Sequence, residues 1–189
     1  NTINTIASLI RTDPETARKL LREFAVFYRR TLEDSADLIV FAREMEQTKR
    51  YFTFEVARFG ADRVEMEMRI DPRVEDMLVP PFLLQPLVEN AVRHAMPSEG
   101  KLTIEVTGEV TGNDVIVRVC DNGVGMTEEA RCNILHPESS LGLGIAVKNV
   151  HDRICGYFGP GTHMEVESEL GKGTCVILVL KEGALREYP

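Results

Sequence analysis

The chain has no tryptophan and only four cysteines, which are Cys120, Cys132, Cys155 and Cys175. They form no CxxC pair and no paired spacing, so neither a zinc site nor a disulfide framework is indicated. Cys120 and Cys175 fall in strand-like apolar runs, and we expect all four cysteines to be free thiols in a reducing compartment. No run approaches the ~20 apolar residues of a membrane span, and no basic-then-apolar signal segment opens the chain.

Positive charge is also scarce, because 22 Lys and Arg residues stand against 30 Asp and Glu residues and give a net charge of −8. An acidic surface repels a phosphate backbone, which argues against general DNA or RNA binding. A small phosphorylated ligand is not excluded, since glycine amides can outweigh the global charge locally. With 43% hydrophobic residues, the chain is too apolar for a disordered tail.

The first sixty residues show helical periodicity. Asp13 and Pro14 suit the N-cap and the first position of a helix. Another helix is expected from Ala42 onwards, and Gly60 is a plausible stop for it. The resulting helical arm, residues 1–60, can pack its stripes within one chain or against a second copy in a four-helix bundle. The stripes consist of Ile3, Ile6, Ile10, Leu20, Phe24, Phe27, Met45, Phe52, Val56 and Phe59.

After Gly60 the pattern changes to period two, which predicts strands with one polar face. One-sided strands imply a mostly antiparallel or mixed sheet whose covering helices lie on a single face. The expected fold class is therefore α+β, a two-layer α/β sandwich over residues 61–189 that follows the arm. Strands are expected at residues 64–70, 102–107, 115–120, 164–167 and 174–180, and helices at 82–95, 128–135 and 145–157.

Four short segments carry residues suited to ligand chemistry. In the first, Asn90, Arg93 and His94 stand at i, i+3 and i+4 of a helix and are expected to share a polar face. An Asn side chain supplies the neutral oxygen that suits Mg²⁺, and a cation and an imidazole beside it suit phosphate. In the second, Asp121 ends a strand and can accept a hydrogen bond from an exocyclic amine. Gly123 and Gly125 would then let the backbone approach a flat ligand.

In the third segment, Gly142, Leu143 and Gly144 lead into a helix, where free N–H groups and the helix dipole attract anions. In the fourth, Gly171, Gly173 and Thr174 open the last strand. Each segment alone also fits an ordinary role: a polar helix face, a DNG turn, a flexible connection or a hairpin. No GK[ST] follows the glycines, so a Walker A loop is excluded.

The order and spacing of these segments resemble the N, G1, G2 and G3 boxes of the Bergerat, or GHKL, ATP-binding fold. The resemblance covers roughly residues 62–180, and the superfamily includes histidine kinases, gyrase-type topoisomerases, Hsp90 and MutL. Within it, three stretches look very like the C-terminal region of LytS-type sensor histidine kinases. These stretches are the opening NTINTI, residues 11–15 (RTDPE) and residues 80–91 (PPFLLQPLVENA).

The resemblance implies a role for each matching residue. Asn90 would bind Mg²⁺ and ATP, Arg93 would contact phosphate, and Asp121 would accept the adenine amino group. The remaining residues would surround the nucleotide, with His94 on its flank, Gly123 and Gly125 against the purine, Gly142, Leu143 and Gly144 over the phosphates, and Gly171, Gly173 and Thr174 on the adenine side.

The implied function is that of the ATP-binding catalytic region of a two-component kinase. It would pass the γ-phosphate of ATP to a histidine and thence to an aspartate of a response-regulator receiver domain. In the family motif H-F-L-F-N-T-x-N, the Asn after Phe matches Asn1, so the acceptor histidine would lie just before this chain. The resemblance further implies a homodimeric parent protein in the bacterial inner membrane. This region would be its cytoplasmic part, without direct membrane contact.

Two other functions are weighed against this one. A GHKL ATPase of the gyrase, MutL or Hsp90 kind would need a hydrolytic Glu one turn before Asn90, where this chain has Pro86. Glu89 points about 100° away from Asn90 on the helix, and the stretch between Met126 and Gly142 is short for such an ATPase. The second alternative is a nucleotide-binding regulator without kinase activity. A related serine-kinase anti-sigma factor would not share the resemblance at residues 1–6 and 11–15.

Overall fold

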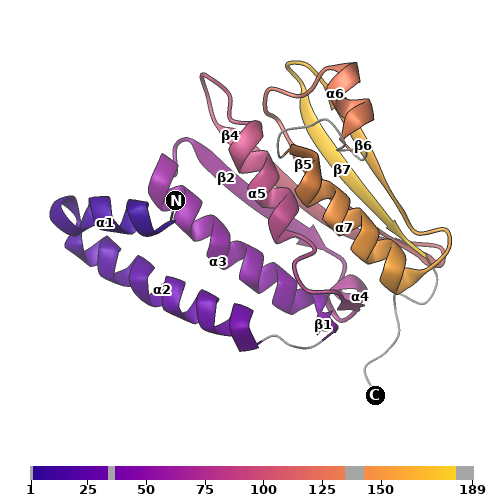
Figure 1. The fold of residues 1–189 in the computed structure, drawn as a ribbon, viewed down its shortest axis with the longest axis horizontal. Helices are drawn as coiled ribbons and strands as arrows, with labels where there is room; N and C mark the ends of the chain where they lie inside the picture. Colours follow the sequence, from indigo (N-terminus) through magenta and orange to yellow (C-terminus); the bar gives the residue numbers. More distant parts are fainter. Residues whose placement is uncertain (1, 34–36, 135–142, 182–189) are drawn as a thin grey trace.

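The computed structural model describes residues 2–33, 37–134 and 143–181 of the chain. Its main sheet has the strand order β2-β4-β5-β7-β6, in which β2 and β4 run parallel and all other neighbours antiparallel (Figure 1). This confirms the expected mixed, mostly antiparallel sheet. The strands are β2 (Val64–Ile70), β4 (Leu102–Thr111), β5 (Asp114–Asp121), β6 (His163–Glu169) and β7 (Gly173–Leu180).

Helices cover one face of this sheet, which confirms the two-layer α/β sandwich (Figure 1). Three long helices form the layer: α3 (Phe41–Phe59), α5 (Gln85–His94) and α7 (Leu143–Phe158). Two short helices, α4 (Pro72–Glu75) and α6 (Glu128–Asn133), lie at its margins. The sequence did not predict a small antiparallel pair, β1 (Ile39–Val40) with β3 (Leu78–Val79), because two residues carry no periodicity.

The two faces of the sheet differ because side chains alternate along each strand. Leu102, Ile104 and Val106 of β4 are fully buried beneath the helices, and Val115 and Val117 of β5 extend the same core. Ion pairs cover the opposite face, where each adds at most about 1 kcal/mol. They join Lys101 to Glu65 at 2.7 Å, Arg69 to Glu105 at 2.8 Å and Arg118 to Glu109 at 2.5 Å.

The arm begins with α1 (Thr2–Thr12) and α2 (Pro14–Glu33), which meet at the predicted break. Asp13 Oδ1 accepts a hydrogen bond from the Thr16 N–H at 3.1 Å, as expected of an N-cap. Ile6 and Leu20 are buried, whereas Ile3 and Ile10 are 64% and 60% exposed. The α1 stripe is therefore only partly covered within the chain. The Phe27 side chain lies outside the described part.

Helix α3 packs on both sides. Phe41, Met45 and Phe52 belong to the main core, while Phe54 joins Ile6, Ala17 and Leu20 in a second, smaller one. The Gly60 N–H donates to the Val56 carbonyl at 2.9 Å, and its φ of +97° confirms the predicted helix stop. The boundary at residues 60–61 stays a prediction, since α3 lies on its arm side and yet packs on the sandwich. In the described ranges no helix has the length and apolar character of a membrane span.

Phe54 allows a test of how the arm is attached. Phe54→Ala should cost about 3 kcal/mol of contact between the arm and α3, so the amides of α1 and α2 should exchange hydrogen faster. The sheet amides should keep their protection, as measured by hydrogen exchange. Phe52→Ala, two residues away in the main core, is the matched control and should lower protection in the sheet as well. Loss of sheet protection in Phe54→Ala would show that the two cores are one cooperative unit.

Candidate functional site

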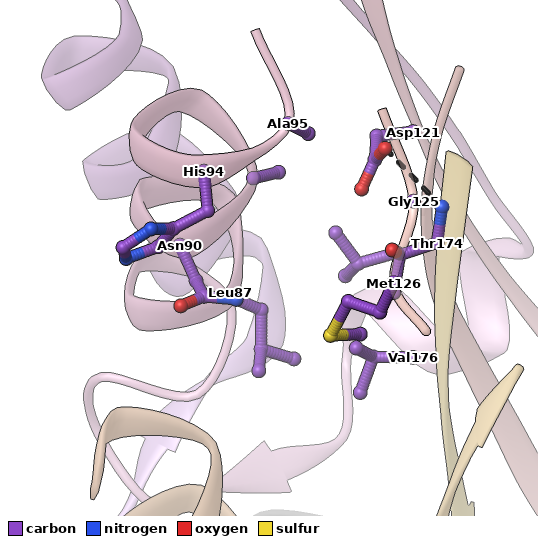
Figure 2. A pocket seen from close by; sticks show the side chains of 11 residues that line it. Leu87, Asn90, His94, Ala95, Asp121, Gly125, Met126, Thr174 and Val176 are labelled. Carbon is purple, nitrogen blue, oxygen red and sulfur yellow. Dashed lines mark hydrogen bonds between the residues drawn. The ribbon is translucent and has the colours of Figure 1, made fainter. Parts of the chain in front are cut away.

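Helix α5 supplies one wall of a cleft. Leu87, Val88, Ala91 and Val92 anchor it in the core, and Asn90 lies beside this buried stripe. Asn90 and His94 stand one turn apart, and both are among the residues that line the cleft (Figure 2). Partial burial lowers the pKa of His94, and the positive charge of Arg93 lowers it further. The imidazole is thus biased toward its neutral form, which can both donate and accept a hydrogen bond.

The last residue of β5, Asp121, stands in the opposite wall. Its Oδ1 accepts hydrogen bonds from the Gly123 N–H at 2.9 Å and from the Thr174 N–H at 3.2 Å. Burial raises the pKa of Asp121, and these two bonds oppose the rise. The second carboxylate oxygen faces the cleft (Figure 2). A half-buried carboxylate with one oxygen held and the other open is suited to accept a hydrogen bond from a bound amine.

Close backbone packing explains three of the predicted glycines. A Cβ at Gly123 would lie 2.0 Å from the Ala95 carbonyl oxygen, and one at Gly173 would lie 1.9 Å from that of Asp121. Gly125 has a φ of +64°, and its Cβ would meet the Glu169 carbonyl oxygen at 2.0 Å. Of the three, only Gly125 lines the cleft. Gly123 and Gly173 do not line the cleft themselves. Because they lack a Cβ, they let the strand ends, the hairpin and α5 approach one another.

Ser168 is a site residue that the sequence did not reveal. Its hydroxyl donates to the Gly173 carbonyl, accepts from the Met126 N–H and contacts Thr174 Oγ1, each at 2.9 Å. It therefore fixes the segment after Asp121 against the start of β7. A serine in an alternating strand looks like any other polar residue. Only the pairing of β6 with β7 gives it this position.

The cleft between these walls has a volume of about 430 Å³ with its open mouth. Three of the four predicted segments converge there, through Asn90, Asp121 and Thr174, whereas Leu143 and Gly144 of the other segment are not among the described lining residues. Its lining is mostly apolar and suits a flat ring whose amine reaches Asp121. The lining residues are Leu87, Asn90, Ala91, His94, Ala95, Val119, Asp121, Gly125, Met126, Thr174 and Val176.

A divalent cation would have few protein ligands here. Among the described residues no group of three or more His, Cys, Asp or Glu side chains is placed to hold a metal. The amide oxygen of Asn90 is a suitable hard ligand, and Mg²⁺ commonly takes one or two protein oxygens and completes its shell with water and phosphate. The donor set therefore fits a magnesium ion that arrives with a phosphorylated ligand.

The structure does not bring Arg93 into the cleft. Its guanidinium donates to Glu89 at 2.9 Å and lines a separate groove, together with Tyr51, Glu55 and Arg58. The reason is geometric, because Arg93 and His94 are one residue apart and diverge by about 100° around the helix axis. The expected face shared by Asn90, Arg93 and His94 thus holds for the first and the last only. The predicted phosphate contact of Arg93 stays a prediction.

The glycine segment before α7 is only partly described. Gly142 lies outside the described residues, and Leu143 and Gly144 belong to the first turn of α7, so the helix is confirmed but begins two residues before the predicted start at Ile145. Gly171 closes the β6–β7 hairpin with a φ of +78°, and its N–H donates to the Val124 carbonyl at 2.9 Å. Gly171 therefore binds the β6–β7 hairpin to the segment after Asp121, although neither it nor Gly144 is among the described residues that line the cleft.

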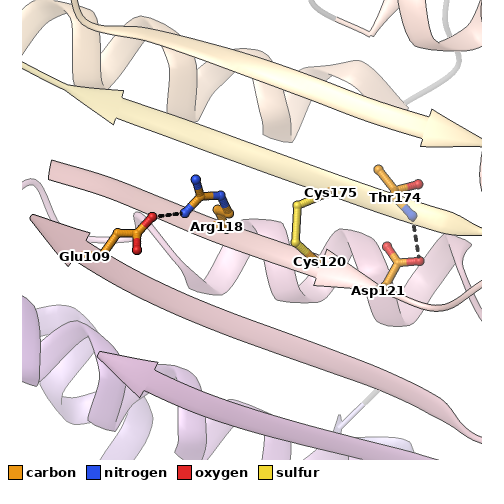
Figure 3. Close-up of a disulfide and its surroundings, with 6 residues drawn as sticks. All are labelled: Glu109, Arg118, Cys120, Asp121, Thr174 and Cys175. Carbon is orange, nitrogen blue, oxygen red and sulfur yellow. Dashed lines mark hydrogen bonds and ion pairs between the residues drawn. A yellow bond between two sulfur atoms is a disulfide. The ribbon is translucent and has the colours of Figure 1, made fainter. Parts of the chain in front are cut away.

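The expectation that all cysteines are free is wrong for two of them. Cys120 and Cys175 form a disulfide between β5 and β7, where they are directly opposite each other with Cα atoms 3.9 Å apart (Figure 3). They precede Asp121 and follow Thr174, so the bridge lies next to the cleft but on the other face of the sheet. A separation of 55 residues hid this pairing in the sequence. Cys132 and Cys155 are free thiols.

Comparison with known proteins agrees with the resemblance to histidine kinases. The family model of histidine kinase-, DNA gyrase B- and HSP90-like ATPases matches residues 82–184, and a histidine kinase model matches residues 1–64. The chain is 38% identical to the sensor protein LytS of Bacillus cereus over 95% of its length and 31% of that protein. It is 35% identical to the sensor histidine kinase/phosphatase LytS of Staphylococcus aureus over 89% of its length and 30% of that protein.

Solved structures share the fold at low sequence identity. The catalytic domain of histidine kinase ThkA superposes with a TM-score of 0.59 at 18% identity and covers 77% of this chain and 94% of that domain. The histidine kinase domain of a blue-light activated kinase from Erythrobacter litoralis gives 0.56 at 19% identity, over 95% and 87%. The chain spans about a third of the length of the curated relatives it matches. It belongs to the family of histidine kinase-, DNA gyrase B- and HSP90-like ATPases, and its curated relatives there are LytS-type sensor histidine kinases.

Proposed function

We propose that the cleft binds Mg-ATP and that the chain is the ATP-binding catalytic region of a sensor histidine kinase. The convergence of Asn90, Asp121 and Thr174 on one cleft is the observation that carries the proposal. The open oxygen of Asp121 would accept the adenine amino group, with Thr174 and Gly125 beside the ring. Asn90 would hold Mg²⁺, and His94 would lie along the nucleotide, near its phosphates.

The reaction would be transfer of the γ-phosphate of ATP to an imidazole nitrogen, followed by transfer to an aspartate of a receiver domain. Such a transfer depends on positioning and on neutralisation of charge more than on covalent help from the protein. The bound magnesium would supply most of the charge neutralisation. This chain would contribute the adenine contact, the Asn90 ligand and N–H groups at the start of α7, whereas a phosphate contact of Arg93 would first require its guanidinium to leave Glu89.

Hydrolysis of ATP without an acceptor is the first alternative, and the lining of the cleft speaks against it. Within the described part of the chain, Asp121 is the single carboxylate that lines the cleft, and it stands at the predicted adenine end. Glu89 faces the other groove and binds Arg93, while Pro86 takes the position of a hydrolytic Glu. Steady-state turnover of ATP with no histidine acceptor present would favour this alternative.

Transfer of labelled γ-phosphate to an added histidine-containing acceptor domain would reject the second alternative, a purely regulatory role.

The arm exposes apolar side chains that suit a partner. On α1 and α2, Ile3, Ile10, Leu21 and Tyr28 are more than half exposed. These residues could pack against a second copy in a helical bundle, which supports a homodimeric parent protein. A response-regulator receiver domain as partner and an inner-membrane location of the parent, with this region in the cytoplasm, rest on the likeness to LytS proteins.

Asp121→Asn tests the adenine contact. Loss of the charged acceptor should weaken Mg-ATP binding by about 1.5–3 kcal/mol, and ADP should lose the same amount because both nucleotides share the base. Isothermal titration calorimetry measures this. Asp114→Asn is the matched control, since Asp114 lies at the other end of β5 and pairs with Lys181 at 2.7 Å. Equal affinity of Asp121→Asn and the wild type would disprove the assignment.

Asn90→Ala tests the metal site. Removal of the amide ligand should reduce the affinity for Mg-ATP about tenfold or more, whereas ATP in the presence of a chelator should bind the variant and the wild type alike. Fluorescence competition with a labelled nucleotide measures both affinities. Asn133→Ala on α6 serves as the control, because Asn133 does not line the cleft. A similar loss with and without magnesium would assign Asn90 to another role.

The raised pKa of Asp121 gives a pH dependence with a definite sign. In the free protein the carboxyl takes a proton as the pH falls through this raised value. Adenosine, which carries no phosphate, should therefore bind more weakly toward acid pH, and Asp121→Asn should abolish that slope. In stability, Asp121 contributes most below its ordinary pKa of 3.8 and less as the pH rises through the raised value. An unchanged slope in Asp121→Asn would rule out this carboxylate as its cause.

A further inference from the structure

The start of α5 lacks a cap from its own sequence. Leu84 occupies the N-cap position and makes no side-chain hydrogen bond to the helix, and Pro86 stands in the first turn. The first N–H groups of a helix have no partner within it and are costly to bury unpaired. Since Leu84 is fully buried, these groups need an acceptor from elsewhere in the fold.

Glu44 of α3 supplies that acceptor from forty residues away. Its Oε1 accepts from the Leu84 N–H at 2.9 Å and the Gln85 N–H at 3.4 Å, and its Oε2 accepts from the Phe82 N–H at 3.0 Å. The residue is 0% exposed. Burial raises the pKa of Glu44, and the N–H groups of residues 82–85 oppose the rise. A negative charge here also complements the positive end of the α5 dipole.

Helix α7 holds the same segment from the other side. Arg153 Nη1 donates to the Pro81 carbonyl at 2.5 Å and to the Phe82 carbonyl at 3.3 Å. Between the two contacts, Phe82 has a φ of +60°, which a non-glycine residue rarely adopts. This segment, residues 81–85, thus has three N–H groups bound to Glu44 of α3 and its first two carbonyls bound to Arg153 of α7.

This segment is the meeting point of three helices that differ in role. Helix α3 carries Phe54, to which α1 and α2 are attached. Helix α5 carries Asn90 and His94 on the cleft wall, and α7 begins within the glycine segment, at Leu143. Asp121 and Thr174 lie on strands that make none of these contacts. A shift of the start of α5 would therefore move Asn90 relative to Asp121, while the hydrogen bond from the Val124 N–H to the Ala95 carbonyl at 3.1 Å holds the far end of the helix beside the adenine end.

We propose that Glu44 is a positioning residue that sets α5, and with it Asn90, relative to the strand wall of the cleft. Because Glu44 belongs to α3, a movement of α3 or of the arm attached to it would change the position of Asn90 at the metal and phosphate end of the nucleotide site. The inference rests on the proposed function, because it concerns the binding of Mg-ATP in that cleft. It adds a residue outside the cleft that controls one half of the site.

Glu44→Gln is the informative substitution. A glutamine can keep the oxygen that receives the Leu84 and Gln85 N–H groups, but its NH₂ group then faces the Phe82 N–H, a donor against a donor. The segment must shift, whereas removal of a buried charge spares the fold a desolvation cost. We expect a folded protein whose Mg-ATP affinity falls about tenfold and whose affinity for adenosine is unchanged. Glu46→Gln, exposed on the same helix and paired with Arg50, should change neither affinity.

The full test is a double-mutant cycle with Asn90→Ala, measured by calorimetry with Mg-ATP and with adenosine on the complete chain. If Glu44 acts through Asn90, adding Glu44→Gln to Asn90→Ala should cost less than about twofold in further affinity. Circular dichroism and urea unfolding verify that each variant is folded. Equal losses for Mg-ATP and adenosine, or additive losses in the cycle, would overturn the inference. Failure of the wild type to bind Mg-ATP would instead overturn the proposed function.

Discussion

The strand wall of the cleft depends on the bonds made by one carboxylate oxygen. Asp121 Oδ1 receives the N–H of Gly123 from its own loop and the N–H of Thr174 from a strand 53 residues further on. These bonds form where β5 and the β6–β7 hairpin come so close that Gly125 and Gly173 leave no room for a Cβ, and where Gly123 packs equally closely against Ala95 at the end of α5. The close packing thus has two results at once: it turns the other Asp121 oxygen to the cleft, and it presents bare backbone where a flat ligand would lie.

The helical wall obeys a different constraint. A helix satisfies its own backbone groups along its length, so α5 meets the strand wall through side chains except at its C-terminal end, where the Ala95 carbonyl accepts from the Val124 N–H at 3.1 Å. The first turn of the helix is the other place where its backbone is open to anchoring. Glu44 and Arg153 bind at this end, and both come from other helices. The adenine side of the site is accordingly built by the sheet, and the side that holds Asn90 by contacts among helices.

Local patterns were enough to predict most elements. Alternation at residues 64–70 and 102–107, the Asp13-Pro14 pair and the Gly60 stop act within a few residues, and each lies where it was predicted. The features that the sequence missed depend on contacts between distant residues or on the direction of a side chain. The pairing of Cys120 with Cys175, the bonds of Ser168 and the buried carboxylate of Glu44 exist only after strands and helices have packed. Arg93 was grouped with Asn90 by spacing alone, although its side chain diverges from that of His94 by about 100° around the helix axis and lines a separate groove.

The charge of the cleft explains why a metal belongs to the proposal. Among the residues that the structure describes, the lining includes one carboxylate and no lysine or arginine, on a chain of net charge −8. A bare triphosphate entering there would meet repulsion and no fixed cation. The apolar surface and the Asp121 oxygen can hold the adenine base, but they do not neutralise the negative charges of the triphosphate at the open side of the cleft. Binding of the triphosphate would therefore depend on magnesium at Asn90 and on the amides that start α7, so the position of α5 decides whether that end of the site works.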